Sequence, residues 1–270
     1  MFGGLVPALL GSATVAGASA LVGLRWRRIS VYQRLIETIG RFKSEPSVIR
    51  TSFGLRPETP DFSDRLATVG EFLSSELIEA IRSEIAPLVA ERSFIPGHKQ
   101  GGTVAYERLI ARAPVTVGFY HSAEFQTFIS RIVGARVQPT PVWDQSSLSV
   151  LVYSRPGDHI GWHYDHNFYQ GRHFTVLLII RNEGAGTQQL SHCVLSINRD
   201  GKVAAIPTPT NTLVVFEGAR ILHMVSPVHE KEIRIALSMT YCTNDRARWW
   251  QEIARRMKDT AFFGPRALWT

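Results

Sequence analysis

The sequence has only two cysteines, Cys193 and Cys242, among its 270 residues. Two thiols do not make the disulfide framework of a small secreted domain, and a thiol-poor chain fits a reducing compartment at least as well as an oxidising one. The apolar content of 44% is ordinary for a globular protein, and the length allows one large domain with appendages. We therefore expect a substantial hydrophobic core, with both cysteines buried in it.

Charged side chains are absent from the first 24 residues, where leucine and valine recur among glycine, alanine and serine. An uncharged stretch of this length can span a bilayer as a helix. Arginines follow the stretch at Arg25, Arg27 and Arg28, which favours an uncleaved anchor over a secretory signal, although Ala18-Ser19-Ala20 resembles a cleavage site. We predict a membrane anchor over residues 1–25 with the remainder of the chain on the cytoplasmic side. A cleaved signal, or a packed or disordered extension of a cytoplasmic protein, remains the alternative.

Acidic residues are scarce in the segment that follows. Residues 25–50 contain seven Lys and Arg against Glu37 and Glu45, which gives +5 of the net charge of +7. Apolar residues recur at helical spacing, so residues 26–50 are predicted to form a basic amphipathic helix, and residues 1–42 offer a route to membrane association. Basic segments also occur in nucleic-acid-binding proteins, but no recognisable binding motif accompanies this one, so we expect no nucleic-acid partner.

Two helices are predicted at the start of a domain spanning residues 51–243. Ser74 can cap the first helix, whose apolar stripe runs from Leu77 to Leu88, and Gly134 ends the second, which spans Ser122 to Val133. Residues 244–270 form a separate C-terminal unit, with a helix predicted from about Asp245 to Lys258. That helix carries Trp249 and Trp250 near its start, and it is expected to pack on the sheet as a lid or to lie on anionic lipid.

Short apolar segments separated by turn residues dominate the middle of the chain. Such a pattern indicates an antiparallel sandwich or barrel, with the preceding helices covering one sheet. The predicted strands are Val137 to Val142, Ser147 to Tyr153, Phe174 to Ile180, Cys193 to Ile197, Thr212 to Phe216, Ile221 to Val225 and Ile233 to Tyr241.

Metal-ligand side chains recur in this β-rich region. His163 and Asp165, in Gly-Trp-His-Tyr-Asp-His, are two positions apart, so on an extended strand they would point to one face. His223 lies in a later strand-like segment and could complete the set. Two histidines and one carboxylate form the facial triad that holds non-haem Fe(II) and leaves coordination positions open.

The last predicted strand contains an isolated arginine. Its odd positions, Ile233 to Tyr241, are apolar, whereas Arg234 shares the opposite face with small residues such as Ala236, Ser238 and Thr240. An unpaired buried charge costs several kcal/mol, so Arg234 needs an anionic partner. A dicarboxylate could supply that partner through a bidentate pair.

This pattern resembles the Fe(II)/2-oxoglutarate-dependent dioxygenases over residues 147–241. The resemblance implies a mainly β protein with flanking helices around a double-stranded β-helix, or jelly-roll, core. It also implies Fe(II), 2-oxoglutarate and O2 as cofactor and cosubstrates, with His163, Asp165 and His223 as catalytic metal ligands and Arg234 as a cosubstrate ligand. The family more often has Arg-x-Ser than the Arg-x-x-x-Ser found here, so Ser238 is a less secure cosubstrate ligand than Arg234.

Two branches of that family share further residues with the chain. Tyr153 and Thr175 are spaced around His163 as in prolyl hydroxylases, where such residues line the cosubstrate pocket; both could also be ordinary strand residues. Residues 157–165, 171–175 and 101–104 are similar to the bacterial amino-acid halogenases and their hydroxylating relatives. In the halogenases a small residue replaces the carboxylate, whereas this chain keeps Asp165, which favours a hydroxylase.

The resemblance implies hydroxylation of a C–H bond in a small polar substrate such as an amino acid, with succinate and CO2 as coproducts. Asp144, Trp162 and Asn167 could orient that substrate, although Trp162 could be core and Asn167 a turn residue. His159 and His166 could replace His163 if the strand register slipped by one residue. The histidines interpreted as ordinary polar side chains are His98, His121, His192 and His229. Two other hypotheses are a non-catalytic β-barrel binding module and a cupin-like iron enzyme that does not use 2-oxoglutarate.

Overall fold

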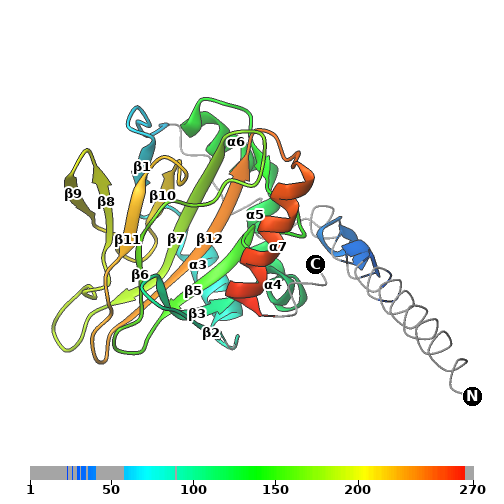
Figure 1. The fold of residues 1–270 in the computed structure, drawn as a ribbon. Helices are drawn as coiled ribbons and strands as arrows, with labels where there is room; N and C mark the ends of the chain where they lie inside the picture. The colour runs from blue at the N-terminus through cyan, green and yellow to red at the C-terminus, as the bar shows by residue number, and fades with distance from the viewer. Residues whose placement is uncertain are drawn as a thin grey trace, which may run out of the picture.

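The computed structural model describes residues 58–264 except residue 89, together with residues 23, 26, 29, 30, 32–34 and 36–40. Twelve antiparallel strands dominate the described part of the chain, which confirms the prediction of a mainly β protein. The sheet curls into two walls (Figure 1). Strands β5, β7, β10 and β12 lie in one wall, and strands β6, β8, β9 and β11 lie in the other. Most consecutive strands from β5 to β12 therefore lie in opposite walls, as in a jelly roll.

The first wall has the order β1-β10-β7-β12-β5 and the second has the order β6-β11-β8-β9. Strand β3 pairs with β6 at its start, through Lys99 and Gln100, and with β5 at its end, through residues 102–104, so it joins the two walls. Strand β2 adds to β3, and β4 adds to β12. The bounds are β1 Leu66–Val69, β2 Glu91–Ile95, β3 Lys99–Val104, β4 Gln138–Pro139, β5 Leu148–Tyr153, β6 His159–His163, β7 His173–Glu183, β8 Leu195–Arg199, β9 Lys202–Ile206, β10 Leu213–Phe216, β11 Leu222–Val225 and β12 Ile233–Cys242.

The alternation of β12 separates the core from the interior of the barrel. Leu237, Met239 and Tyr241 are fully buried in the main core, on the side of the wall that the helices cover. Arg234 and Ser238 point the other way, into a cavity between the two walls. The two-residue period of a strand therefore places one polar face inside the barrel.

Helices cover the outer face of the first wall. They are α3 (Ser75–Ile85), α4 (Tyr106–Arg112), α5 (Pro114–His121) and α6 (Ala123–Val133). Ser74 accepts a hydrogen bond from the backbone N–H of Leu77 at 3.2 Å, and Gly134 ends α6 in the left-handed conformation, so both predicted caps are confirmed. Helix α7 (Trp249–Phe263) contacts β2 and β3 beside the mouth of the barrel (Figure 1).

Several element boundaries differ from the sequence-based prediction. The strand expected over Val137 to Val142 is only the two residues of β4, because a turn begins at Val142. Helix α7 begins four residues later than predicted and ends five residues later, since Arg248 and Gln251 form its capping box. Strands β1, β2, β3 and β9 and helices α4 and α5 were not predicted; most of them are short, and β3 contains two consecutive glycines.

No helix in the described part of the chain is both long and apolar enough to cross a membrane. The predicted anchor over residues 1–25 lies, apart from Gly23, outside the described residues. Within the predicted amphipathic helix, residues 29–40 are helical wherever they are described. Ile39 is buried in the main core and the ring of Tyr32 lies 5.1 Å from that of Trp143, whereas Ile29 and Ile36 are exposed. This helix therefore packs part of its apolar surface on the domain.

Candidate active site

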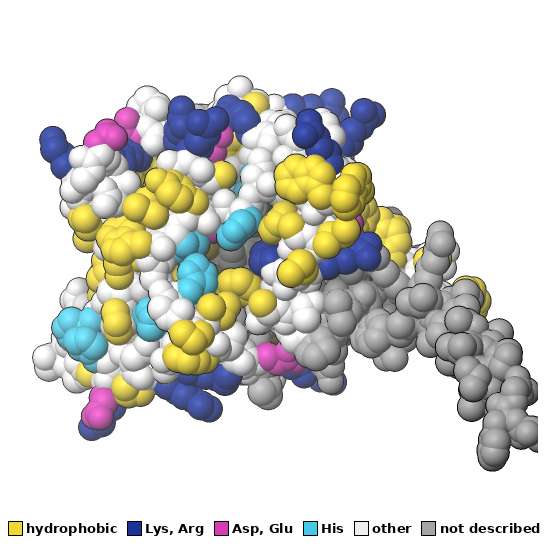
Figure 2. Space-filling model, viewed as in Figure 1, with side chains coloured by type: hydrophobic (Ala, Val, Ile, Leu, Met, Phe, Trp, Pro, Cys, Tyr) yellow, Lys and Arg dark blue, Asp and Glu magenta, His cyan; other side chains and the backbone are white. Residues whose placement is uncertain are grey.

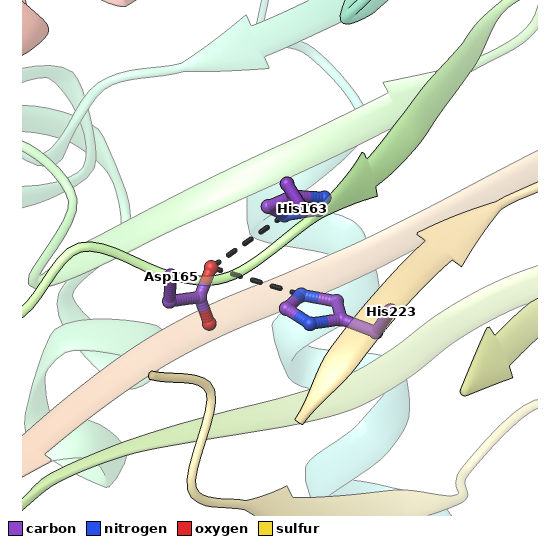
Figure 3. A group of neighbouring side chains, drawn as sticks. All are labelled: His163, Asp165 and His223. Atoms are coloured by element: carbon purple, nitrogen blue, oxygen red, sulfur yellow. Dashed lines mark ion pairs between the residues drawn. The ribbon is translucent and has the colours of Figure 1, made fainter. Parts of the chain in front are cut away.

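His163 and His223 face each other across two neighbouring strands. His163, the last residue of β6, is the direct partner of His223 on β11, and their ring centroids lie 4.1 Å apart. The register shifts immediately after His223, which marks an irregularity of the kind that often lies beside active sites. Residues far apart in the sequence thus meet because β6 and β11 pair (Figure 3).

The backbone fixes the tautomer of both imidazoles. His163 Nδ1 donates a hydrogen bond to the carbonyl of Gly161 at 2.8 Å, and His223 Nδ1 donates to that of Ile221 at 2.9 Å. A ring nitrogen that donates in this way leaves the other nitrogen with a free lone pair. Both Nε2 atoms therefore face the interior as potential metal ligands.

Asp165 completes the set from a loop rather than from a strand. Its Oδ1 lies 3.6 Å from His163 Nε2 and 3.7 Å from His223 Nε2. The two side chains converge as expected, but Asp165 lies beyond the strand, because β6 ends at His163. A hydrogen bond from the Asp165 N–H to the carbonyl of Gly218, at 3.1 Å, holds the loop instead.

Thr175 orients the carboxylate. Its hydroxyl donates to Asp165 Oδ2 at 2.5 Å, which leaves Oδ1 facing the two imidazoles. Burial would raise the pKa of Asp165, but the charge of His223 and the hydrogen bonds from His163 and Thr175 outweigh it, so this pKa lies well below its usual range. Burial lowers the pKa of His223, which favours the neutral imidazole that binds metal.

The three side chains offer ligand atoms that all lie within 4.8 Å of one another. This donor set of two imidazoles and one carboxylate fits Fe(II). A second cluster, of His192, His229 and Glu232, also meets that distance. There, however, Glu232 already accepts hydrogen bonds from the backbone N–H groups of both histidines and from His192 Nδ1, so it joins two loops.

A cavity of about 160 Å³ opens beside the triad. Histidine side chains gather around this hollow at the centre of the face shown in Figure 2. Arg234 and Tyr153, which are direct partners across β12 and β5, line the cavity and are almost completely buried. Arg234 Nε and Nη2 and the Tyr153 hydroxyl have no hydrogen-bond partner among the described residues. Buried donors normally have partners, and the carboxylate of a ligand would satisfy these.

A family model described as Halogenase D matches residues 60–262. The chain belongs to the halogenase D family. This confirms the suspected membership of the Fe(II)/2-oxoglutarate oxygenase superfamily, and the match includes α7 as well as the barrel. No curated protein matches the sequence.

Solved structures of oxygenases share the fold of this halogenase D family member. A prolyl-4-hydroxylase from Pseudomonas putida is 17% identical, with a TM-score of 0.50 over 68% of this chain and 94% of that one. A prolyl hydroxylase from Trichoplax adhaerens, in complex with a peptide of hypoxia inducible factor, is 18% identical, with a TM-score of 0.50 over 72% and 87%. A 2OG-Fe(II) oxygenase family oxidoreductase from Burkholderia pseudomallei is 15% identical, with a TM-score of 0.52 over 69% and 89%.

The remaining predicted residues divide into those in the cavity wall and those outside it. Ser238 and Asp144 line the cavity. Trp162 is 42% exposed and does not, while Asn167 holds a turn by accepting from the Tyr169 N–H and donating to the Gly171 carbonyl. Trp162 and Asn167 therefore have no place in the described wall of the cavity.

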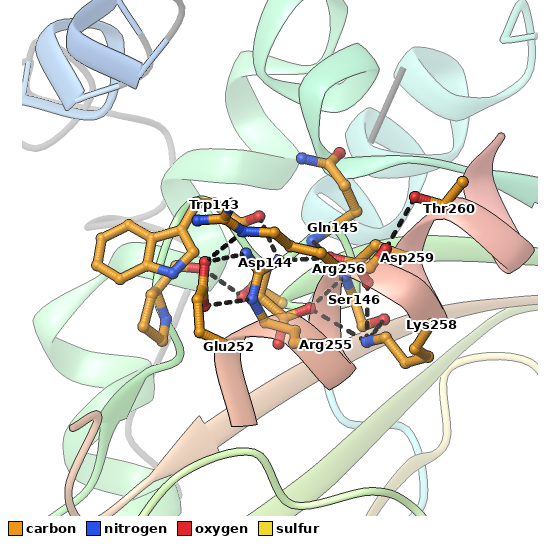
Figure 4. A network of polar contacts seen from close by, with 12 residues as sticks. Trp143, Asp144, Gln145, Ser146, Glu252, Arg255, Arg256, Lys258, Asp259 and Thr260 are labelled. Atoms are coloured by element: carbon orange, nitrogen blue, oxygen red, sulfur yellow. Dashed lines mark hydrogen bonds and ion pairs between the residues drawn. The ribbon is translucent and has the colours of Figure 1, made fainter. Parts of the chain in front are cut away.

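Asp144 is engaged by the protein itself. Its Oδ1 accepts from the Ser146 N–H and lies 3.3 Å from Lys258 Nζ, and its Oδ2 accepts from the Tyr169 hydroxyl at 2.6 Å. Figure 4 shows this carboxylate inside a network that ties residues 143–146 to α7. The pKa of Asp144, which burial alone would raise, is lowered to about 2 by Lys258 and Arg255.

Four residues of the site were missed or interpreted otherwise from the sequence. His98 was interpreted as an ordinary polar side chain, but it lines the cavity, and its ring centroid lies 5.3 Å from that of His163. Lys99 and Phe262 also line the cavity, and Gly218 adjoins Asp165. His98 and Lys99 follow the Pro96-Gly97 turn, where their direction depends on β3, whose pairing no local pattern revealed.

Proposed function

We propose that this protein is an Fe(II)/2-oxoglutarate-dependent oxygenase that hydroxylates an unactivated C–H bond of a small polar substrate such as an amino acid, releasing succinate and CO2. The observation that carries the proposal is the convergence of His163, Asp165 and His223 beside Arg234, a buried cation with unpartnered donors. Membership of the halogenase D family and the shared fold support the general class.

His163, Asp165 and His223 would hold one face of the iron and leave its remaining positions for ligands. Bound there, Fe(II) would supply the oxidising chemistry by which O2, 2-oxoglutarate and the substrate react. The two backbone carbonyls that hold the Nδ1 atoms keep both imidazoles in the ligating tautomer. Thr175 keeps Asp165 turned so that a single oxygen faces the metal position.

Arg234 would bind the distal carboxylate of 2-oxoglutarate through its free N–H groups, and the Tyr153 hydroxyl would donate a further hydrogen bond. Ser238 lies two residues beyond Ala236 on the same face of β12 and can contribute a hydroxyl to the same pocket. Apolar side chains, among them Leu151, Leu177 and Leu195, line the cavity and exclude water from this ion pair.

Asp165 supports hydroxylation over halogenation. Its carboxylate fills the position that a halide would need. The Thr175 hydrogen bond holds the carboxylate there, and the lack of a side chain at Gly218 leaves room for it. Halogenation is the second candidate, because the family carries that name. Turnover with saturating chloride and bromide, followed by mass spectrometry of the product, separates the two: we expect a gain of one oxygen and no halogen.

Anaerobic addition of Fe(II) and 2-oxoglutarate to the purified protein tests the proposal directly. We expect the weak visible charge-transfer band of the chelate. Its absence would contradict the assignment and is the result expected of a non-catalytic binding module. Substrates would then be sought by stimulated succinate release.

Arg234→Leu tests the cosubstrate against the cupin-like alternative. Loss of a buried charge-assisted pair should weaken 2-oxoglutarate binding by about 10- to 100-fold while Fe(II) still binds. Arg136→Leu, which removes an exposed arginine, is the control. A substrate-dependent activity that is unchanged in Arg234→Leu would favour an iron enzyme without 2-oxoglutarate.

A further inference from the structure

Lys99 is a buried cation in the wall of the active-site cavity. It begins β3, the strand that joins the two walls, and its partner on β6 is Ile160, three residues before His163. The residue is 3% exposed and lines the same cavity as the triad. Lysine is rarely buried unless it is paired, so this placement requires a reason.

No carboxylate pairs with Lys99 among the described residues. Its ammonium donates to Thr103 Oγ1 at 2.8 Å and lies 4.9 Å from the centroid of the Phe262 ring. An ammonium has three donors, so most of its hydrogen-bonding capacity remains unused. Burial, together with the charge of Lys258, lowers the pKa of Lys99 to about 8.

Lys258 lines the same cavity but, unlike Lys99, has carboxylate partners within the described part of the chain. Its Nζ donates to Ser146 Oγ at 2.6 Å and pairs with Asp259 Oδ1 at 2.9 Å and with Asp144 Oδ1 at 3.3 Å. Both carboxylates near it are therefore committed. Within residues 58–264, as far as they are described, one of these two lysines has carboxylate partners and the other has none.

We propose that Lys99 binds the carboxylate of the substrate, so that the enzyme takes a small carboxylic acid whose acid group lies against β3. This inference rests on the proposed function and names the substrate class of that site. The two carboxylates in the described wall of the cavity are Asp144, held by Lys258 and Tyr169, and Asp165, a metal ligand. An anionic end of the substrate therefore has a partner in the cavity, and neither carboxylate of the described wall competes for Lys99.

Two separate cations would serve two separate acids. Arg234 lies on β12 opposite Tyr153, and β5 separates β12 from β3 in the sheet. The distal carboxylate of 2-oxoglutarate would occupy the Arg234 end, and the substrate carboxylate the Lys99 end. Loss of Lys99 should therefore weaken binding of the substrate acid and leave 2-oxoglutarate binding unchanged.

Hexanoate and its neutral analogue hexanamide are suitable probes, because they differ in the charge at one end. The protein is first loaded anaerobically with Fe(II) and 2-oxoglutarate, which fills the Arg234 end, and loading is verified by the charge-transfer band. Calorimetric titration should show that Lys99→Met weakens hexanoate binding at least tenfold and leaves hexanamide binding unchanged. Lys202→Met, on the exposed strand β9, is the matched control and should match the wild type.

A second measurement does not depend on the metal. In metal-free protein with saturating 2-oxoglutarate, the NMR signal of the Lys99 side-chain carbon, identified by its absence in Lys99→Met, should titrate near pH 8. Hexanoate should raise that midpoint by at least one pH unit, and hexanamide should not. Hexyl phosphate tests whether a phosphate is accepted instead, and stronger binding of it would overturn the carboxylate assignment.

The failures of the two proposals are distinguishable. An absent charge-transfer band would contradict the oxygenase assignment, whatever hexanoate does. A normal band with equal hexanoate affinity in wild type and Lys99→Met would overturn the role of Lys99 alone. Weaker 2-oxoglutarate binding in Lys99→Met would also overturn it, by assigning Lys99 to the cosubstrate.

Discussion

Gly218 is required by the close approach of Asp165. A Cβ atom at position 218 would lie 2.0 Å from Asp165 Oδ2, far inside van der Waals contact, and the backbone carbonyl of Gly218 also holds the Asp165 N–H. A side chain at this position would have to displace the carboxylate that completes the triad. The glycine is therefore part of the metal site although it offers no ligand.

We predict that Gly218→Ala weakens Fe(II) binding at least tenfold, because Asp165 must move away from the two imidazoles. Gly70→Ala is the control, since a Cβ atom there meets nothing within 4 Å. Metal affinity is measured by anaerobic titration, with circular dichroism to verify folding. Equal affinity in the two variants would show that the loop of Asp165 adapts.

Thr175 offers a test of the hydrogen bond to the metal ligand. Removing the hydroxyl in the near-isosteric Thr175→Val leaves Asp165 Oδ2 without its donor at 2.5 Å. Residues that orient metal ligands typically change metal affinity by about 10- to 100-fold, and we expect a loss in that range. Thr175→Ser keeps a hydroxyl and should retain most of the affinity; if serine is no better than valine, the bond does not matter.

At the scale of elements, β3 and α7 each place a lysine in the cavity, and the two should affect stability in opposite directions. Lys99 has no anionic partner in the part of the chain that the structure describes, and burial moves its pKa from 10.5 to about 8, which corresponds to about 3 kcal/mol of destabilisation at neutral pH. Lys258 neutralises Asp144 and Asp259, and leaving them unpaired costs about 3 to 5 kcal/mol.

We predict that Lys99→Met raises the free energy of unfolding at pH 7 and that Lys258→Met lowers it, as measured by urea denaturation. The gain from Lys99→Met has a defined pH dependence. Below pH 8 the folded state holds a desolvated charge; between pH 8 and 10.5 only the unfolded state stays protonated, so wild-type stability recovers as the pH rises. The advantage of Lys99→Met should therefore shrink across that window. A destabilised Lys99→Met would show that its packing outweighs its charge.

Features that depend on local sequence could be predicted, and those that depend on contacts between distant segments could not. The period of β12 predicted which residues face the core and that Arg234 faces inward, because alternation is a local property of a strand. Ser74 and Gly134 were predicted as helix ends for an equally local reason. The position of Asp165 in a loop held by Gly218 could not be predicted, since it depends on a contact between segments about fifty residues apart.

At the scale of the whole molecule, the segment before residue 58 contributes to the core without lining the described cavity wall. Ile39 is buried in the main cluster and Tyr32 packs against Trp143. The family match begins only at residue 60, and β1 at Leu66. The oxygenase barrel is thus expected to be a folding unit that the N-terminal helix stabilises.

We predict that a chain beginning at residue 58 folds and binds Fe(II) and 2-oxoglutarate as tightly as the full chain, but is less stable by about 2 to 4 kcal/mol, because apolar surface around Ile39 and Trp143 becomes exposed. Calorimetry and the charge-transfer band measure the two properties separately. Loss of the band in a folded truncated protein would assign a role in the site to the N-terminal segment.

The membership of the superfamily could be inferred from a few residues because their identity and spacing are fixed by chemistry. Fe(II) needs its donor set, and the cosubstrate needs its arginine, wherever the surrounding strands begin and end. The proposed role of Lys99 depends instead on which described side chains surround it in space, and that cannot be recognised from a local sequence pattern.

The direct opposition of His163 and His223 has a mechanical consequence. The two residues are about sixty positions apart in the chain. A cation bound by both would link β6 to β11 and close a long loop, which lowers the conformational entropy that the chain gains when these strands separate. Iron would then stabilise the fold as well as supply the chemistry. Removal of the metal would weaken the pairing of β6 with β11 first, so loss of activity and local loss of stability at these two strands would occur together.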